Sequence, residues 1–363
     1  MMDYLGGSLE RLTTPALCVD LEAFEHNVQT LARLLTQRGK AWRPHMKGHK
    51  TTAIAWRQMG EGAVGVTCAR LAEAEVYAQA GIRSLLVAHQ LASPQQWERA
   101  AALCRHSDLI ICADHYAQVE PLSAVCRRWN VTCRVLIEVN IGMNRAGTRP
   151  GKDAVELAQA VDRLPHLELL GLMGYEGHVM RMTDQEKKRQ KLAESMAQLQ
   201  RCRELFVQHG LRCDVVSAGG TGTWHLTSEY DVVTEVQAGG GVFGDLLYTR
   251  EMQVPELRPA LTVLTTITSR PEKQRAIIDA GRKAINAEIY WPEVKGVPGA
   301  KVASLSAEHG ILELHGEAQN LRIGDRLELW VGYADFTTAW HAAFYGIRQG
   351  RIEAVWPIVA RGW

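Results

Sequence analysis

The chain has 363 residues, and its 41 lysines and arginines nearly balance 40 aspartates and glutamates, giving a formal net charge of +1. This balance and an aromatic content of 7% favour neither a polyanionic partner nor a base-stacking surface, so we expect no nucleic acid partner. The length exceeds what one small core needs, which predicts a large domain with a second, smaller one.

The eight cysteines are scattered, and no two of them form a Cys-x-x-Cys pair. This pattern is typical of small buried side chains in a reducing compartment, and it argues against a disulfide framework or a zinc cage. The chain shows no signal-peptide pattern at its start and no apolar stretch long enough to cross a bilayer. We therefore expect a cytoplasmic protein with no membrane partner.

From about residue 16 to about residue 250, short apolar runs alternate with segments of helical composition, such as 71–80 and 185–208. Eight such repeats over roughly 200–250 residues predict an α/β fold, a (β/α)8 TIM barrel spanning residues 16–250. The predicted barrel strands are Ala16–Val19, Ala41–Lys47, Ala63–Cys68, Ser84–Val87, Asp108–Cys112, Arg134–Val139, Leu169–Tyr175 and Asp214–Ala218.

After about residue 255 the runs become rich in β-branched residues and are separated by turns, which predicts a C-terminal β-rich domain over 255–363. Residues 1–15 are too short to fold alone, and we expect an N-terminal strand there that joins the β-domain. The predicted strands of this domain are Ala260–Arg270, Gln274–Asp279, Lys301–Leu305, Gly310–His315 and Arg326–Val331.

The segment Trp42–Lys50 crowds two lysines and two histidines where a barrel strand should end. A lysine at that position can be desolvated and aimed into the pocket that the βα loops build, which suits Schiff-base formation. Taken alone, a solvated basic turn is the more common explanation. Features further along the chain favour the Schiff-base explanation.

Two glycine-rich segments follow predicted strands late in the barrel, Ser217–Thr223 and Gly239–Gly241. Consecutive glycines allow backbone N–H groups to converge on an anion, and this part of a barrel is the usual place for a phosphate. A flexible loop would look the same in isolation. Together with the N-terminal lysine, these loops predict a cofactor that carries a phosphate.

Further polar residues leave the sixth and seventh predicted strands. Arg145 could donate to a phenolate or carboxylate at the barrel mouth, although a surface arginine is equally consistent. Tyr175, Glu176 and His178 leave the seventh strand together, where they could flank a planar ring or move protons.

Together these segments resemble the fold-type III pyridoxal-phosphate enzymes, and within them the D-threonine aldolase and D-serine dehydratase branch. The resemblance runs nearly end to end and is most specific over Arg43–Lys50, with C-terminal likeness at Asp279–Ala284 and Ser306–Gly310. It implies a barrel of the alanine racemase N-terminal type, pyridoxal 5′-phosphate, a small amino-acid substrate and a homodimer.

The resemblance also implies roles for single residues. Lys47 would be the Schiff-base lysine, Arg145 would face the phenolic oxygen of the cofactor, and Tyr175 would lie beside its pyridine ring. Gln237 falls close to where racemases place an arginine against the pyridine nitrogen. The other residues implied in cofactor binding are His45, Ser217, Gly219, Gly220, Thr221, Gly222, Gly239, Gly240 and Gly241.

The chain departs from this branch where the branch usually binds a divalent metal, through His-x-Asp or His-x-Cys in the β-domain. Asp335 is present, but Tyr333 stands where the histidine should be. A carboxylate with a neutral phenol is a poor site for Mn²⁺, Mg²⁺ or Zn²⁺. Asp335 remains a candidate metal ligand, with His309 or His341 as conceivable partners, so metal dependence is an open question.

The leading hypothesis is a lyase that cleaves a D-3-hydroxy amino acid by retro-aldol chemistry to glycine and an aldehyde, with Lys47, Asp335 and Tyr333 as catalytic residues. One alternative is dehydration of D-serine or D-hydroxyaspartate. Another is a metal-free racemase or epimerase with Lys47 and a tyrosine on opposite faces of the cofactor. A non-enzymatic pyridoxal-phosphate-binding protein is disfavoured, because such relatives have a single domain.

Overall fold

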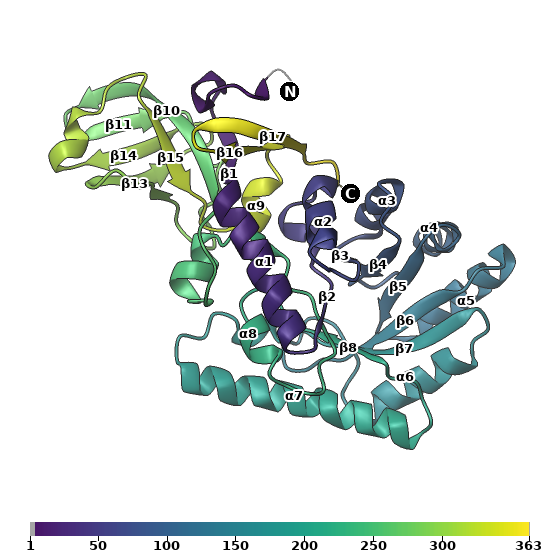
Figure 1. Ribbon diagram of the computed structural model, residues 1–363. Helices are drawn as coiled ribbons and strands as arrows, with labels where there is room; N and C mark the ends of the chain where they lie inside the picture. Colours follow the sequence, from purple (N-terminus) through teal and green to yellow (C-terminus); the bar gives the residue numbers. More distant parts are fainter. Residues whose placement is uncertain (1–3, 363) are drawn as a thin grey trace. The chain divides into compact units, whose positions relative to one another are not determined.

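The computed structural model describes residues 4–362, and these residues form two compact units (Figure 1). The first unit comprises residues 4–30, 48–54 and 240–362, and the second comprises 31–47 and 55–239. The division falls within helices α1 (Leu21–Gln37) and α2 (Thr52–Gly60). Within the described residues, no helix combines the length and the hydropathy that a membrane span requires.

The second unit is built on an eight-stranded parallel sheet in the order β2-β9-β8-β7-β6-β5-β4-β3. A parallel bridge between His45 and Thr67 joins the chain just beyond β2 to β3, which closes the ring of strands. The predicted barrel is therefore confirmed. Its strands are β2 (Ala41–Trp42), β3 (Val66–Cys68), β4 (Ser84–Val87), β5 (Asp108–Ala113), β6 (Cys133–Glu138), β7 (Leu167–Met173), β8 (Val215–Ala218) and β9 (Glu235–Val236).

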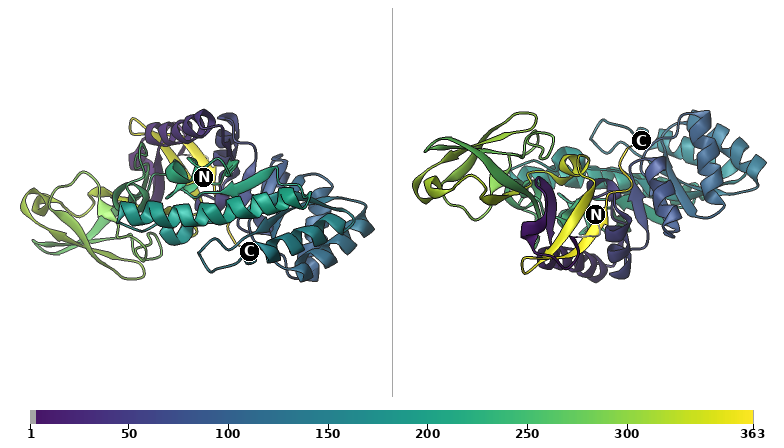
Figure 2. Two further views of the ribbon diagram at one scale, coloured as in Figure 1. Left: turned by 90° about the horizontal axis from the view of Figure 1, so that it is seen from below. Right: turned by 90° about the horizontal axis from the view of Figure 1, so that it is seen from above.

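The helices of this unit follow the strands in alternation. They are α3 (Leu71–Gln79), α4 (Pro94–Cys104), α5 (Tyr116–Trp129), α6 (Lys152–Arg163), α7 (Gln185–Gln208) and α8 (Trp224–Thr227). The long helix α7, drawn in teal at the front of the left view of Figure 2, packs against β7 and α6. It begins where the Asp184 carboxylate accepts hydrogen bonds from the backbone N–H groups of Glu186 and Lys187, a usual N-cap arrangement.

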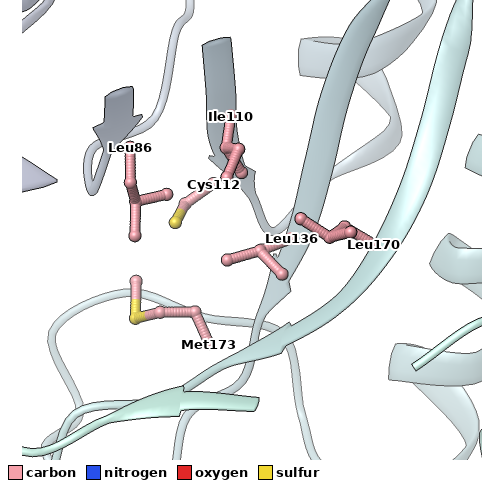
Figure 3. Packing of buried hydrophobic residues seen from close by; sticks show 6 residues of the cluster. All are labelled: Leu86, Ile110, Cys112, Leu136, Leu170 and Met173. Atoms are coloured by element: carbon pink, nitrogen blue, oxygen red, sulfur yellow. The ribbon is translucent and has the colours of Figure 1, made fainter. Parts of the chain in front are cut away.

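The barrel strands are apolar along their length because both faces of a parallel sheet are covered. One buried cluster brings together side chains from four neighbouring strands, with Ile110 and Cys112 two residues apart on the same face of β5 (Figure 3). This packing fixes the strand ends from which the functional loops leave. The cluster comprises Leu86, Ile110, Cys112, Leu136, Leu170 and Met173.

One predicted barrel strand is wrong. The run Ala16–Val19 forms β1 (Ala16–Asp20), which pairs antiparallel with β10 (Leu261–Glu272) and parallel with β16 (Ala343–Arg348) in the other sheet. The eighth barrel strand is β9 instead. β9 escaped the sequence analysis because it has only two residues, one of them a glutamate, and so lacks an apolar run.

The first unit contains a nine-stranded mixed sheet, in which β1 lies between β10 and β16. Near the N-terminus, Gly6 N–H donates to Ile352 O at 2.8 Å, and Ile352 N–H donates to Gly7 O at 2.9 Å. The remaining elements are β11 (Arg275–Ile278), β12 (Glu293–Val294), β13 (Ala300–Leu305), β14 (Gly310–Leu314), β15 (Arg326–Trp330), β17 (Arg351–Pro357) and α9 (Ala334–Thr338).

Candidate active site

Most of the predicted cofactor residues of the second unit follow strand ends, and Ser217 lies within β8 itself. His45 and Lys47 come after β2, Arg145 after β6 and Tyr175 after β7, and the loop 219–223 follows β8. Because neighbouring strands are parallel, these residues emerge at one end of the barrel, the end that carries chemistry in this architecture.

Lys47 lies in a 3₁₀ turn, Met46–Gly48, and its side chain is exposed. Its backbone N–H donates to Nδ1 of His45 at 3.3 Å, which places the proton of a neutral His45 ring on Nε2. His45 N–H in turn donates to Gln237 O at 3.0 Å. A Cβ at Gly239 would collide with the His45 carbonyl, so only glycine lets these two loops approach each other.

Arg145 and Tyr175 are in contact, with the guanidinium 5.5 Å from the centre of the tyrosine ring, within the range of a cation–π interaction. Both line a small pocket together with Glu138 and Met143. Burial raises the pKa of the Glu138 carboxyl, and the hydrogen bond from Gln90 and the charge of Arg145 oppose that rise. The pocket therefore holds one cation and one acid whose pKa is raised by burial.

Glu176, which is fully buried, holds the loop that follows β8 by hydrogen bonds. One carboxylate oxygen accepts hydrogen bonds from the hydroxyls of Thr223 and Thr227, each at 2.6 Å, and the other accepts from Gly219 N–H at 3.3 Å. A Cβ at Gly220 would lie 2.9 Å from the Tyr175 ring, so the loop passes this ring closely. Glu176 thus fixes the loop that was predicted to hold a phosphate.

Replacing Glu176 with glutamine is expected to weaken pyridoxal phosphate binding about tenfold and to lower the unfolding free energy by about 1–3 kcal/mol. The amide keeps the side chain's shape but has a single acceptor oxygen for three donors. Fluorescence titration of the cofactor and urea unfolding of the cofactor-free protein measure the two effects. The matched control is Glu204→Gln on the exposed side of α7. Cofactor affinity equal to that of the wild type would contradict the role of Glu176.

Ser217 and Gln237, both predicted to bind the cofactor, belong to a hydrogen-bonded chain. Gln237 Nε2 donates to Ser217 Oγ at 3.0 Å, and Ser217 Oγ donates to Glu235 Oε1 at 2.7 Å. The other oxygen of Glu235 accepts from Arg43 Nε at 2.7 Å, in an ion pair that is almost entirely buried. The side chains beside the glycine loop are therefore held by a charged pair beneath them.

Sequence reasoning missed several of these supporting residues. It grouped Glu176 with Tyr175 but gave it no part in holding the loop, and it did not identify Glu235. Lys188 is also buried, with Nζ 3.3 Å from Gly222 O and 3.2 Å from Met180 O, and burial lowers its pKa. Lys188 lies among other charged residues of α7, so nothing in the sequence distinguishes it.

In the first unit, Tyr333 and Asp335 are partners. The Tyr333 hydroxyl donates to Asp335 Oδ2 at 2.8 Å, and Tyr333 is only 9% exposed. Burial, followed by the negative charge of Asp335, raises the pKa of Tyr333, so the phenol stays neutral. One oxygen of the candidate metal ligand is thus already occupied by a proton donor.

The two histidines considered as metal partners do not complete a site. His341 Nε2 lies 2.7 Å from Ala284 O, and His309 is exposed. Within residues 4–362, no three histidine, cysteine, aspartate or glutamate side chains are grouped so as to hold a metal ion. A carboxylate whose neighbour is a neutral phenol does not match the donors that Mn²⁺, Mg²⁺ or Zn²⁺ prefers, and these residues do not fit the metal.

The comparison with protein families identifies the family to which this barrel belongs. Residues 19–246 match the alanine racemase N-terminal domain, which covers more than half of the chain. The chain belongs to this family. Residues 260–347 match a second family, described as a putative serine dehydratase domain. The resemblance predicted from the sequence is therefore confirmed in both parts of the chain.

Similar proteins cover nearly the whole chain. A 3-hydroxy-D-aspartate aldolase of Paracoccus denitrificans (strain Pd 1222) is 31% identical over 97% of this chain and 92% of its own length. The crystal structure of D-threonine aldolase from Filomicrobium marinum matches with a TM-score of 0.96 and 34% identity, over 99% of this chain and 98% of its own. A D-threo-3-hydroxyaspartate dehydratase of Delftia sp. (strain HT23) is 29% identical over 98% of this chain and 99% of its own length.

Pyridoxal phosphate is the cofactor that the family implies, and the second unit fits it. Gly220 and Gly239 let the two glycine-rich loops pass close to the Tyr175 ring and the His45 backbone, where a Cβ would collide. The exposed Lys47 leaves the same end of the barrel as these loops. The barrel thus offers an amine, glycine-rich loops and an aromatic ring at one end.

Proposed function

We propose that this enzyme is a pyridoxal-phosphate-dependent lyase that cleaves a D-3-hydroxy amino acid to glycine and an aldehyde. The observation that carries the proposal is the likeness, over both parts of the chain, to aldolases of D-3-hydroxy amino acids. In retro-aldol cleavage the β-hydroxyl loses its proton, the Cα–Cβ bond breaks, and the bond's electron pair stays on the amino-acid fragment until a proton replaces it. The cofactor, when bound, supplies an electron sink for that pair.

The chain's own residues have distinct tasks in this proposal. Lys47 would hold the cofactor covalently, and the loop 219–222 with Gly239, Gly240 and Gly241 would bind its phosphate. Arg145 would donate to its phenolic oxygen, and Tyr175 would bind against its ring. Gln237, whose Nε2 donates to Ser217 Oγ, would be the neutral side chain nearest the pyridine nitrogen.

The proposed function is tested by product analysis. Purified holoenzyme is incubated with D-threonine and with D-threo-3-hydroxyaspartate, and the L-enantiomers serve as controls. Glycine with acetaldehyde or glyoxylate is the expected result for the D-substrates, detected by mass spectrometry after derivatisation. An absence of both products from every D-3-hydroxy amino acid tried would reject the aldolase.

Dehydration is the second candidate, favoured by the match of residues 260–347 to the putative serine dehydratase domain and by the likeness to the Delftia dehydratase. It would release ammonia and a keto acid in the same assay in place of glycine. Racemisation would exchange enantiomers without breaking a carbon–carbon bond. The raised pKa of Tyr333 opposes the phenolate that a second racemase base would need.

The resemblance that suggests the substrate class also suggests that the chain acts as a homodimer. We propose the cytoplasm as its compartment, as the scattered cysteines predict. Light scattering of the purified holoenzyme tests the oligomeric state. A mass of twice 40.3 kDa is expected. A monomer that is fully active would contradict it.

A further inference from the structure

Lys188 is a buried cation beside the glycine-rich loop that follows β8. Its neighbours on α7 are exposed: the side chains of Lys187 and Arg189 are 72% and 61% exposed. Lys188 itself is only 1% exposed. Its Nζ donates to Met180 O at 3.2 Å and to Gly222 O at 3.3 Å. The ammonium therefore contacts the loop directly, through one of the loop's own backbone carbonyls.

This ammonium has no counter-charge in the part of the chain that the structure describes. Within residues 4–362 its two partners are carbonyl oxygens, and no carboxylate forms an ion pair with it. Burial alone lowers the pKa of Lys188, because no nearby acid offsets the lost hydration. A buried charge is normally paired, since an unpaired one costs free energy. An anion bound at the loop would supply the missing charge.

His225 shows that the electrostatic potential around Lys188 is positive. This histidine lies in α8, directly after the loop. Burial is the main reason that the pKa of His225 is lowered to about 4, and the charges of Lys188, Arg38 and Arg189 lower it as well. The ring is therefore neutral at about pH 7, and the charges that act on it are positive. A positive potential beside the loop favours a bound anion.

The loop also offers a backbone donor to an anion. Gly220 N–H donates to Thr223 Oγ1 at 3.2 Å, and Thr223 N–H donates to Gly220 O at 3.1 Å. Gly222 is buried, yet its N–H donates to no other group of residues 4–362. Buried backbone N–H groups are nearly always hydrogen-bonded. Because Lys188 binds the carbonyl of Gly222, it fixes the residue that carries this spare donor.

We propose that Lys188 is a positioning residue for a phosphate dianion: it fixes Gly222 so that the loop 219–223 can bind the dianion, and the dianion balances its charge. A phosphate monoester carries a charge of about −1.5 to −2 at neutral pH, which suits an unpaired cation and backbone N–H groups. The inference rests on the proposed function, because pyridoxal phosphate supplies the phosphate. All the residues involved belong to the second unit.

The first experiment compares two ligands that differ only by the phosphate. Pyridoxal 5′-phosphate and pyridoxal are titrated into the cofactor-free full-length protein and followed by fluorescence. Lys188→Met removes the charge, so the Kd for pyridoxal phosphate is expected to rise about tenfold, while that for pyridoxal changes by less than about twofold. Lys187→Met, on the exposed side of α7, is expected to bind both ligands as the wild type does. Equal losses for both ligands, or no loss for either, would overturn the inference.

The second experiment observes the phosphate by ³¹P NMR of the holoenzyme. The second pKa of a phosphate monoester lies near about 6, so a phosphate without a nearby cation titrates between about pH 5.5 and 7. In the wild type the signal is expected to keep the shift of the dianion over this range, because Lys188 favours the charged form. In Lys188→Met the signal is expected to titrate. Lost packing alone would not move this titration, so identical curves for both proteins would overturn the role of the charge.

Lys188→Gln guards against a folding defect in Lys188→Met. Its amide can still donate to the Gly222 carbonyl, but it carries no charge. We expect it to lose the preference for pyridoxal phosphate over pyridoxal, as Lys188→Met does. If Lys188→Gln kept the wild-type preference, the charge would have no part in binding and the inference would be overturned.

The outcomes for the inference and for the lyase are separable, because the ligand comparison needs no turnover. A wild type that shows the expected dependence on Lys188 but cleaves no D-3-hydroxy amino acid would keep the inference and reject the lyase. A wild type that cleaves D-threonine, with equal losses of both ligands in Lys188→Met, would keep the lyase and reject the inference.

Discussion

Lys47→Ala is expected to remove the visible absorption of the pyridoxal-phosphate-loaded protein, near roughly 410–420 nm, and to lower kcat/KM by at least about 10³-fold. The amine of Lys47 is the proposed covalent attachment for the cofactor, and alanine has no nucleophile to replace it. The absorption spectrum tests attachment, and the product assay with D-threonine tests turnover. Both are read from the same preparation.

Two further variants make this result specific to the position. Lys47→Arg keeps a positive charge but cannot form the covalent bond, so it is expected to lose the band as well. Lys152→Ala changes an exposed lysine at the start of α6 and is expected to keep both band and activity. A band that persists in Lys47→Ala would assign the attachment to another lysine, with Lys50 of the same segment as the first to examine.

The barrel could be predicted from the sequence because most of its strands are short apolar runs that alternate with segments of helical composition. The run Ala16–Val19 has the same appearance, yet β1 belongs to the other sheet, because a short buried strand carries no local mark of its partners. Conversely, β9 consists of Glu235 and Val236 and offers no periodicity to detect. Pairing with β8 and β2, and not its own composition, makes this segment a strand.

The residues of the candidate site likewise fall into those that the sequence predicted and those that it did not. The glycine loops and the segment around Lys47 were visible because their constraints are local: glycine permits close approach, and lysine supplies an amine. The supporting roles of Glu176 and Glu235 could not be predicted, because each acts on residues far away in the sequence, such as Thr227 and Arg43. In a sequence, a carboxylate that will be buried cannot be distinguished from an exposed one until its hydrogen-bond donors are known.

The ion pair between Arg43 and Glu235 leads to the largest expected effect on stability. The side chains are 7% and 5% exposed, and Arg43 also donates to Ser84 Oγ at 2.9 Å. Glu235→Leu leaves the guanidinium buried without its counter-charge, so the unfolding free energy should fall by about 3–5 kcal/mol. Urea unfolding of the cofactor-free protein measures the loss.

The double variant Arg43→Met/Glu235→Leu shows whether charge pairing or packing dominates. Replacing both charges with apolar side chains of similar volume removes the unpaired guanidinium, so much of the lost stability should return. Ser217 would still lose its acceptor on Glu235, and Gln237 would lose the fixed hydroxyl to which it donates. Stability should therefore recover while cofactor affinity stays low. If both recovered together, the pair would serve the fold alone. If neither stability nor cofactor affinity recovered, the two side chains would contribute independently of each other.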